Sequence, residues 1–158
     1  MISICALILV GSGFMGYFIA NPDRGSDTIS VDIGKKDGDT VVFEDLTLLP
    51  GESTQYNISL DGEVEAECDI TLKFEEKGDK TLKNFVYAKV EFNGKNVYGK
   101  DMLLADLFKA DVMKFSCDLS DGKEHSLKIT YYMPIEVENE AEGAEADFVL
   151  HITASNED

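Results

Sequence analysis

An alternation of apolar and polar residues with a period of two runs through most of this chain and constrains its fold more than any other feature. It is clearest over residues 63–74, where every second residue is apolar: Val64, Ala66, Cys68, Ile70, Leu72 and Phe74. Side chains alternate between the two faces of a β-strand, so such a segment buries one face and exposes the other. The pattern predicts an antiparallel strand in a sheet with one solvated face.

Further segments with the same period predict more strands of this kind. We expect them at residues 29–33, 41–49, 56–60, 85–92, 115–119, 127–133 and 148–152. Turn signals such as Asn93-Gly94 and Asp121-Gly122 separate them. Both residues of an Asn-Gly pair tolerate positive φ, which suits a tight hairpin. Short strands with turns about every 8–12 residues are typical of a β-sandwich.

One segment breaks the alternation. Apolar residues recur every three to four positions at Met102, Leu103, Leu107 and Phe108, which predicts one short helix over the sheet edge or one end of the core. Strands are not interleaved with helices, which disfavours a parallel βαβ fold. We therefore expect an all-β, jelly-roll-like antiparallel β-sandwich of eight or nine strands with one short helix. An immunoglobulin-like sandwich is the alternative, without support from any tryptophan.

An uncharged apolar segment at residues 2–20 stands apart from the alternating part. It is long enough to span a bilayer as a helix, and it also fits the hydrophobic region of a signal peptide, although no basic residue precedes it. A buried core helix is the remaining alternative. We expect the protein to be secreted, or held at the cell surface by this segment. The expected organisation is a signal peptide or hydrophobic membrane-anchor helix at 1–20, a linker at 21–26, a β-sandwich domain at 27–155 and an acidic tail at 156–158.

The chain is strongly acidic, with 31 acidic against 14 basic side chains in 158 residues and a formal net charge of −17. A field of this sign repels nucleic acid and anionic lipid head groups, so we expect neither as a partner and membrane contact only through the N-terminal segment. Acidic stretches at residues 37–39 and 136–147 are candidates for calcium. Neither follows the ligand spacing of an EF-hand, so we expect no cofactor and keep calcium as the one alternative.

Residues with catalytic or metal-binding chemistry are sparse. The sequence has two histidines, and it lacks the zinc-protease, nucleophile-elbow and phosphate-loop motifs. We expect His125 at the surface beside a turn, and His151 on the outward face of the last strand. No catalytic residue and no metal ligand is predicted, and the chain is not expected to be an enzyme.

Two further residue types leave alternatives open. Cys5 lies in the leader, whereas Cys68 and Cys117 lie in the sandwich, without the Cys-x-x-Cys spacing or nearby histidine of a zinc site. They either form a disulfide or serve as small buried apolar residues. The tyrosines of the strands form a sugar-binding platform only if two or three are coplanar on one face, and core packing is the alternative. These tyrosines are Tyr87, Tyr98, Tyr131 and Tyr132.

Several stretches in the same order resemble the TasA/camelysin family of Gram-positive extracellular proteins. They lie at residues 48–72, 90–99, 104–107, 127–134 (LKITYYMP) and 146–155, and the resemblance covers most of residues 27–155. Residues Gly16-Tyr17-Phe18 also resemble the end of leaders cut by a dedicated signal peptidase. The resemblance implies an exported jelly-roll domain that forms biofilm matrix fibres, in which an N-terminal strand of one subunit completes the sheet of the next. Some members carry a metalloprotease label, but no catalytic residue can be carried over to this sequence.

The sequence therefore predicts an exported structural or surface protein, a matrix-fibre or self-assembling subunit acting by strand addition. Residues 27–34 form a half-buried strand pattern that would lie near a free N-terminus after cleavage, and such a strand can pair with another subunit's sheet edge. Ile29, Val31 and Ile33 are the candidate donor contacts, and the alternative is that this strand pairs within its own domain. Expected partners are copies of the chain or other surface proteins. A surface adhesin or carbohydrate-binding module is the alternative function, and a camelysin-like metallopeptidase is less favoured.

Overall fold

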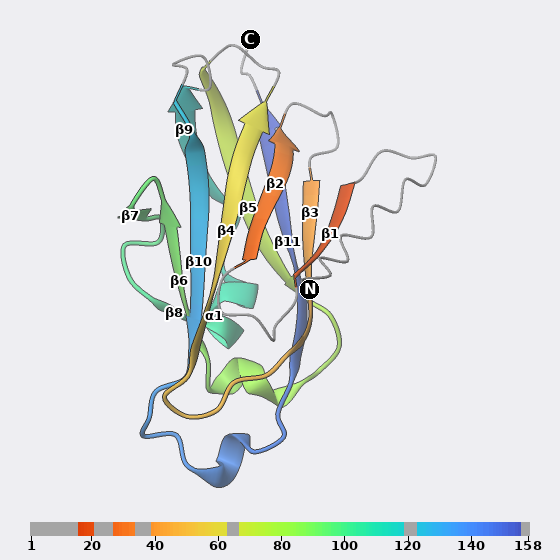
Figure 1. The fold of residues 1–158 in the computed structure, drawn as a ribbon, viewed down its shortest axis with the longest axis vertical. Coiled ribbons are helices and arrows are strands. Elements are labelled where there is room, and N and C mark those ends of the chain that lie inside the picture. Colours follow the sequence, from red (N-terminus) through yellow and green to blue (C-terminus); the bar gives the residue numbers. More distant parts are fainter. Residues whose placement is uncertain (1–15, 21–26, 34–38, 63–66, 119–122, 156–158) are drawn as a thin grey trace, which may run out of the picture.

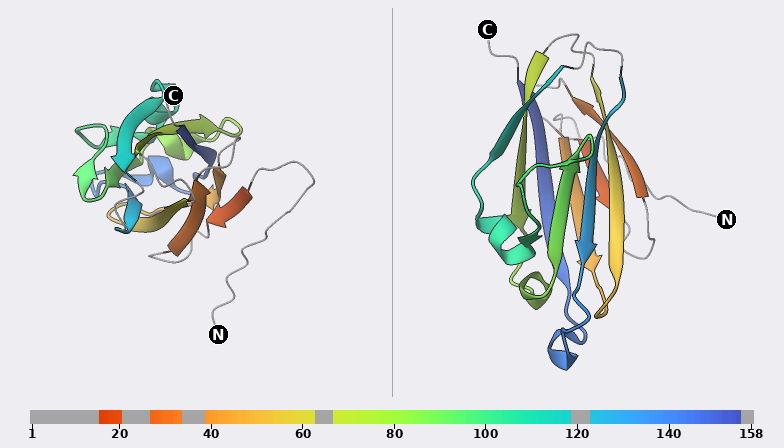
Figure 2. Two further views of the ribbon diagram at one scale, coloured as in Figure 1. Left: turned by 90° about the horizontal axis from the view of Figure 1, so that it is seen from above. Right: turned by 90° about the vertical axis from the view of Figure 1, so that its left-hand side faces the viewer.

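Two β-sheets packed face to face form the body of the protein, as the computed structural model shows (Figures 1 and 2). The structure describes residues 16–20, 27–33, 39–62, 67–118 and 123–155. Sheet A has the strand order β1 (Gly16–Ala20), β3 (Asp39–Leu46), β11 (Ala146–Ser155), β5 (Glu67–Glu76) and β9 (Met113–Asp118).

Sheet B lies opposite and carries the remaining strands. Its order is β2 (Asp27–Ile33), β4 (Ser53–Gly62), β10 (His125–Tyr132), β6 (Tyr87–Phe92) and β7 (Lys95–Asn96), and β8 (Met102–Leu103) also pairs with β6. Within the described residues, three short helices connect strands: η1 (Thr81–Asn84), α1 (Leu104–Lys109) and η2 (Asn139–Ala141).

The strand order is that of a jelly roll. From β3 to β6, each strand lies in the opposite sheet from the strand before it, and the same is true from β9 to β11. The resulting neighbour orders are β3-β11-β5-β9 in sheet A and β4-β10-β6-β8 in sheet B. All neighbours in these two series pair antiparallel. Eight strands in two four-stranded sheets make a jelly roll, so this prediction is confirmed and the immunoglobulin-like alternative is wrong.

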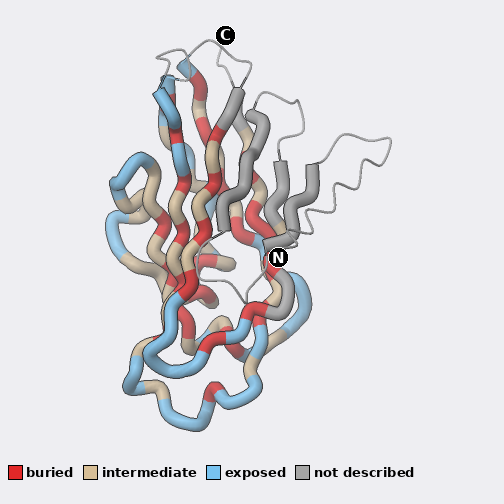
Figure 3. The backbone as a smooth tube through the Cα atoms, viewed as in Figure 1, coloured by how far each residue is buried: buried red, intermediate tan, exposed pale blue. Residues whose placement is uncertain are grey.

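The core lies between the sheets and is built from the alternating residues. On β5, the side chains from Cys68 to Phe74 alternate between buried and half-buried, and β10 shows the same alternation (Figure 3). Rings from both sheets meet at its centre: Phe43 on β3 stacks on Phe148 with 4.7 Å between ring centroids and meets Tyr56 of β4 edge-on at 5.1 Å. The contact between Phe43 and Tyr56 joins the two sheets directly.

The predicted helix is confirmed as α1, which buries Leu104 and Leu107 and packs against β5 and β6. The predicted hairpin at Asn93-Gly94 is also present, with φ of 47° and 84° at these residues between β6 and β7. One strand expected at residues 41–49 ends earlier, since β3 stops at Leu46.

Candidate strand-addition site

β1 and β2 lie at the sheet edges on the same side of the sandwich (Figure 1). β1 pairs with β3 and β2 pairs with β4, and these are the only parallel pairs in the described part of the chain. Each therefore adds one strand to a sheet whose other pairs are antiparallel. β2 also contacts β1, β3 and β11, so it helps to close this side of the sandwich.

The eight strands of the jelly roll do not include β1 or β2. Without them, β3 and β4 would be the edges of their sheets, with unpaired backbone groups that can accept a strand. Both strands are anchored in the core, because Phe43 of β3 and Tyr56 of β4 are buried and belong to the aromatic cluster described above. The β3 and β4 edges with the strands on them form the candidate site.

The predicted donor residues lie on β2. Its register places Ile29 beside Ile58, Val31 beside Leu60 and Ile33 beside Gly62. Ile58 and Leu60 are buried core residues of β4. Within one chain β2 therefore occupies an edge position, and the register brings its alternating apolar residues level with core positions of the neighbouring strand.

β1 coincides with the end of the expected leader. Gly16–Ala20 pairs with β3 from Asp39 to Phe43, whereas residues 1–15 lie outside the described residues. The expected linker at 21–26 and the acidic tail at 156–158 also lie outside them. In the part that is described, no helix has the length and apolar character needed to cross a membrane.

The opposite edge of sheet A is formed by β9, which pairs with β5. On the outer face of this pair, the Asp69 carboxylate accepts a hydrogen bond from Ser116 Oγ at 2.9 Å and meets Lys114 Nζ at 2.8 Å. The hydrogen bonds from Lys114 and Ser116 lower the pKa of Asp69. On the core face, Cys68 and Cys117 are both buried and are present as thiols.

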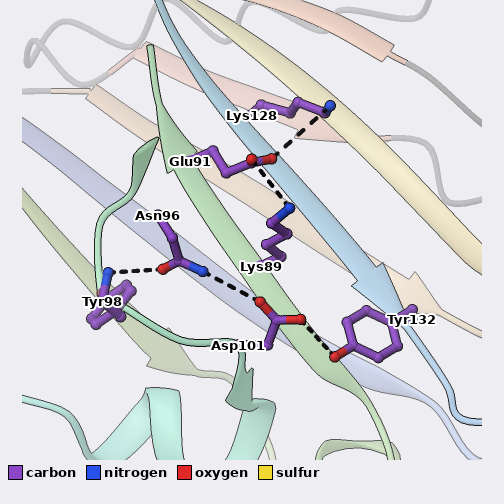
Figure 4. Close-up of polar contacts among 7 residues, drawn as sticks. All are labelled: Lys89, Glu91, Asn96, Tyr98, Asp101, Lys128 and Tyr132. Atoms are coloured by element: carbon purple, nitrogen blue, oxygen red, sulfur yellow. Dashed lines mark hydrogen bonds and ion pairs between the residues drawn. The ribbon is translucent and has the colours of Figure 1, made fainter. Parts of the chain in front are cut away.

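The outer face of sheet B carries a polar network (Figure 4). Asp101 accepts hydrogen bonds from Tyr132 Oη at 2.7 Å and from Asn96 Nδ2 at 3.3 Å, and Asn96 Oδ1 accepts one from the Tyr98 backbone N–H at 3.0 Å. Burial and the bond to Asp101 raise the pKa of Tyr132 to about 12. The network joins the segment between β7 and β8 to strand β10.

Two tyrosines stack beside this network. Tyr87 and Tyr132 are register partners on β6 and β10, with ring centroids 5.7 Å apart and planes 18° apart. Farther along the same face, Glu91 lies 3.2 Å from Lys89 and 4.0 Å from Lys128. Two of the four tyrosines singled out above thus come together on one face, while Tyr131 is in the core.

The two histidines have different surroundings. The prediction that His125 lies at the surface is wrong: it is 8% exposed, stacks on Phe92 and accepts a hydrogen bond at Nδ1 from Asn93 Nδ2 at 2.9 Å. The hairpin turn at Asn93 covers it, which the sequence around His125 does not reveal. His151 lies on the outer face as predicted, with Nε2 at 2.7 Å from Glu75 Oε2.

The acidic stretches were the candidates for calcium. Residues 37 and 38 lie outside the described residues. In the second stretch, Glu145 and Asp147 pair with Lys80 at 3.1 and 2.7 Å, and their hydrogen bonds raise the pKa of that lysine. Across the described ranges, no group of three or more His, Cys, Asp or Glu side chains is arranged to hold a metal ion.

Comparison with known proteins gives structural similarities only. No family model matches the chain, and a search of curated proteins finds no significant match. The structure is similar to a periplasmic inhibitor of g-type lysozyme, PliG of Aeromonas hydrophila, with a TM-score of 0.36, 9% identity, and coverage of 82% of this chain and 99% of that one. It is also similar to the CUB1-EGF-CUB2 domains of rat MASP-1, with a TM-score of 0.41, 12% identity, and coverage of 83% of this chain and 44% of that one.

Proposed function

We propose that this chain is an exported surface or matrix subunit that assembles with copies of itself by strand exchange, in which β2 of one subunit pairs with β4 of the next. The observation that carries the proposal is that the jelly roll from β3 to β11 is complete without β2, which lies in parallel on the β4 edge. A strand that is additional to the fold can leave its own edge and occupy the same edge of a neighbour without disrupting the core.

The expected leader cleavage would favour this exchange. Removal of residues 1–20 also removes β1, which leaves β2 as the strand nearest the new N-terminus. The resemblance to TasA/camelysin proteins supports the same assembly mode and an extracellular location.

The net charge sets the conditions for assembly. Copies that each carry a formal charge of −17 repel one another, and salt screens this repulsion over roughly 10 Å at about 0.1 M ionic strength. The proposal therefore expects assembly to be weak at low ionic strength and stronger when salt is added. Strand pairing itself depends on backbone hydrogen bonds and apolar contacts, which salt does not weaken in the same way.

A truncation tests the proposal. The chain beginning at Asn21 should form species larger than one chain in light scattering at high protein concentration, whereas the chain beginning at Lys35 should stay monomeric and keep its β-sheet circular dichroism. If the chain beginning at Lys35 unfolds, β2 is a necessary member of its own sheet and the proposal fails. It also fails if the chain beginning at Asn21 remains monomeric over the full range of concentration and salt.

The proposal includes no catalytic step. A casein-hydrolysis assay with and without added zinc tests this part, and hydrolysis that requires Glu75 or His151 would point instead to a camelysin-like peptidase. The variants to assay are therefore substitutions of His151 and Glu75, because these residues form a histidine–carboxylate pair on the outer face of sheet A.

A carbohydrate-binding surface protein is the second candidate. The observation behind it is that Tyr87 and Tyr132 share one face of sheet B, although their rings are stacked and not coplanar. Ligand sites combine aromatic side chains with a few polar groups that fix the orientation of the ligand, and Asp101 and Asn96 lie next to this pair. A glycan array with the wild-type chain and with Tyr87→Ala tests this candidate. Binding that is lost in Tyr87→Ala would support it, and the absence of binding to any glycan would count against it.

A further inference from the structure

Cys68 and Cys117 occupy directly opposed positions on β5 and β9, although 48 residues separate them in the sequence. The two strands pair antiparallel, and directly opposed residues of such a pair lie on the same face of the sheet. Both side chains are buried, with exposed fractions of 3% and 5%, so this shared face is the core face. The two thiols are therefore neighbours across the strand pair.

The spacing of an antiparallel pair fits a disulfide. Opposed residues have Cα atoms about 5.5 Å apart in a hydrogen-bonded pair and about 4.5 Å apart in a non-hydrogen-bonded pair. A disulfide spans Cα separations of roughly 4.4–6.8 Å. Either kind of pair falls within that range, so the bond requires adjustment of the side chains and no change of register.

We propose that Cys68 and Cys117 form a cross-strand disulfide that fixes the edge strand β9 to β5 in the exported protein. That the protein is exported to an oxidising compartment rests on the proposed function. The bond itself rests on the register of β5 and β9 and does not require strand exchange. Its consequence is mechanical: β9 is the last strand of sheet A on the side away from β3, and a covalent bond would prevent it from separating from the sheet.

The reaction is thiol–disulfide exchange with an external disulfide, either glutathione disulfide or the disulfide of a protein oxidoreductase. The thiolate of one cysteine attacks the external disulfide and forms a mixed disulfide, and one external thiol leaves. The second cysteine then attacks the mixed disulfide, the intramolecular S–S bond forms, and the second external thiol leaves. The two cysteines lose two electrons and two protons in total, and both are gained by the external disulfide as it becomes two thiols.

The experiment uses the full chain with Cys5→Ser, so that Cys68 and Cys117 are the only cysteines. The protein is reduced and unfolded, then refolded with an excess of oxidised over reduced glutathione. We expect a monomer whose intact mass is about two units below that of the reduced protein, and one peptide pair linked through these cysteines. We also expect reductant to lower the thermal midpoint by about 5–10 °C.

The matched control also carries Cys68→Ala and Cys117→Ala, and its midpoint should not respond to reductant. The proposal is overturned if the refolded protein retains two thiols, if the cysteines link separate chains, or if the oxidised monomer is no more stable than the reduced one. Because refolding is done in vitro, these outcomes do not depend on export or on assembly. If the disulfide proposal fails this test, the strand-exchange proposal is unaffected and is decided by the truncation experiment.

Discussion

Thr54 and Tyr131 are register partners on β4 and β10, and the hydroxyl oxygen of each is buried with no hydrogen-bond partner in the described part of the chain. A buried hydroxyl without a partner costs about 1–3 kcal/mol of folding free energy. The ring of Tyr131 nevertheless packs against Phe43, at 5.5 Å, and against Phe148, at 5.4 Å. The ring therefore stabilises the core while its hydroxyl does not.

Removing only this hydroxyl should not weaken the fold. We expect Tyr131→Phe to raise the free energy of unfolding by about 0.5–2 kcal/mol, because the ring contacts remain and the unpaired group is gone. Tyr132→Phe is the matched control: it removes a hydroxyl that donates to Asp101 and should lower stability by about 1 kcal/mol. Urea unfolding of both variants provides the comparison. A loss of stability in Tyr131→Phe as large as that in Tyr132→Phe would show that the hydroxyl has a partner.

Acid should weaken the fold through exposed carboxylates that are paired in the folded state. Hydrogen bonds from Lys114 and Ser116 lower the pKa of Asp69, and those from Lys77 and His151 lower the pKa of Glu75. A carboxylate with a lowered folded-state pKa contributes stability above its unfolded pKa and loses it as the pH falls through the folded value. We expect the urea midpoint to fall as the pH drops below about 4.5. Asp69→Asn should reduce this dependence, and a midpoint that rises on acidification would contradict the assignment.

The Cys68 thiol should react slowly in the folded, reduced protein. Burial raises its pKa, and the nearby charges of Asp69 and Asp118 raise it further. The reactive form is the thiolate, so iodoacetamide labelling of Cys68 should be slow at neutral pH and should increase as the pH rises above about 9. Labelling in urea is the control, since unfolding exposes both thiols. Rapid labelling of the folded protein at pH 7 would show that the β5–β9 pair opens readily.

The alternating pattern was sufficient to predict the sandwich and much of its core. Period-two spacing identified Ile70, Leu72 and Phe74 as one buried face, and the structure places all three in the core. The helical spacing near Leu107 likewise predicted α1. These are local properties, because the periodicity of apolar residues is set by the geometry of a single strand or helix.

The contacts across strands were not predictable in the same way. Nothing near His125 in the sequence indicates that Asn93 covers it, and nothing near Cys68 indicates that Cys117 lies opposite. Such pairs depend on which strands are neighbours and on their register, and these are settled by the packing of the whole sandwich. The parallel pairing of β2 with β4 also depends on which strands are neighbours. The sequence predicted a strand there but could not show which edge it occupies.

A charge placed on β2 should weaken assembly according to its position. Ile29 is level with the buried Ile58, whereas Ser30 is level with Ser59, which is half-buried. We expect Ile29→Asp to abolish the larger species seen in light scattering, because a carboxylate at a core-level position is costly to bury. Ser30→Asp adds the same charge to the same strand and should reduce assembly much less. Equal loss in the two variants would indicate that net charge, and not the strand face, controls association.

Strand exchange is tested most directly by cross-linking two different chains at the register of β2 and β4. Thr28 lies level with Asn57. One chain carries Thr28→Cys and the other Asn57→Cys, both with the three native cysteines replaced by alanine, and the two are mixed under assembly conditions and oxidised. The account predicts a disulfide between the two chains, and much less of it when Asn57→Cys is replaced by Lys114→Cys on the distant β9. A single chain with both Thr28→Cys and Asn57→Cys is the comparison. If the disulfide forms in that chain but not between the two different chains, β2 remains on its own β4 and the account is wrong.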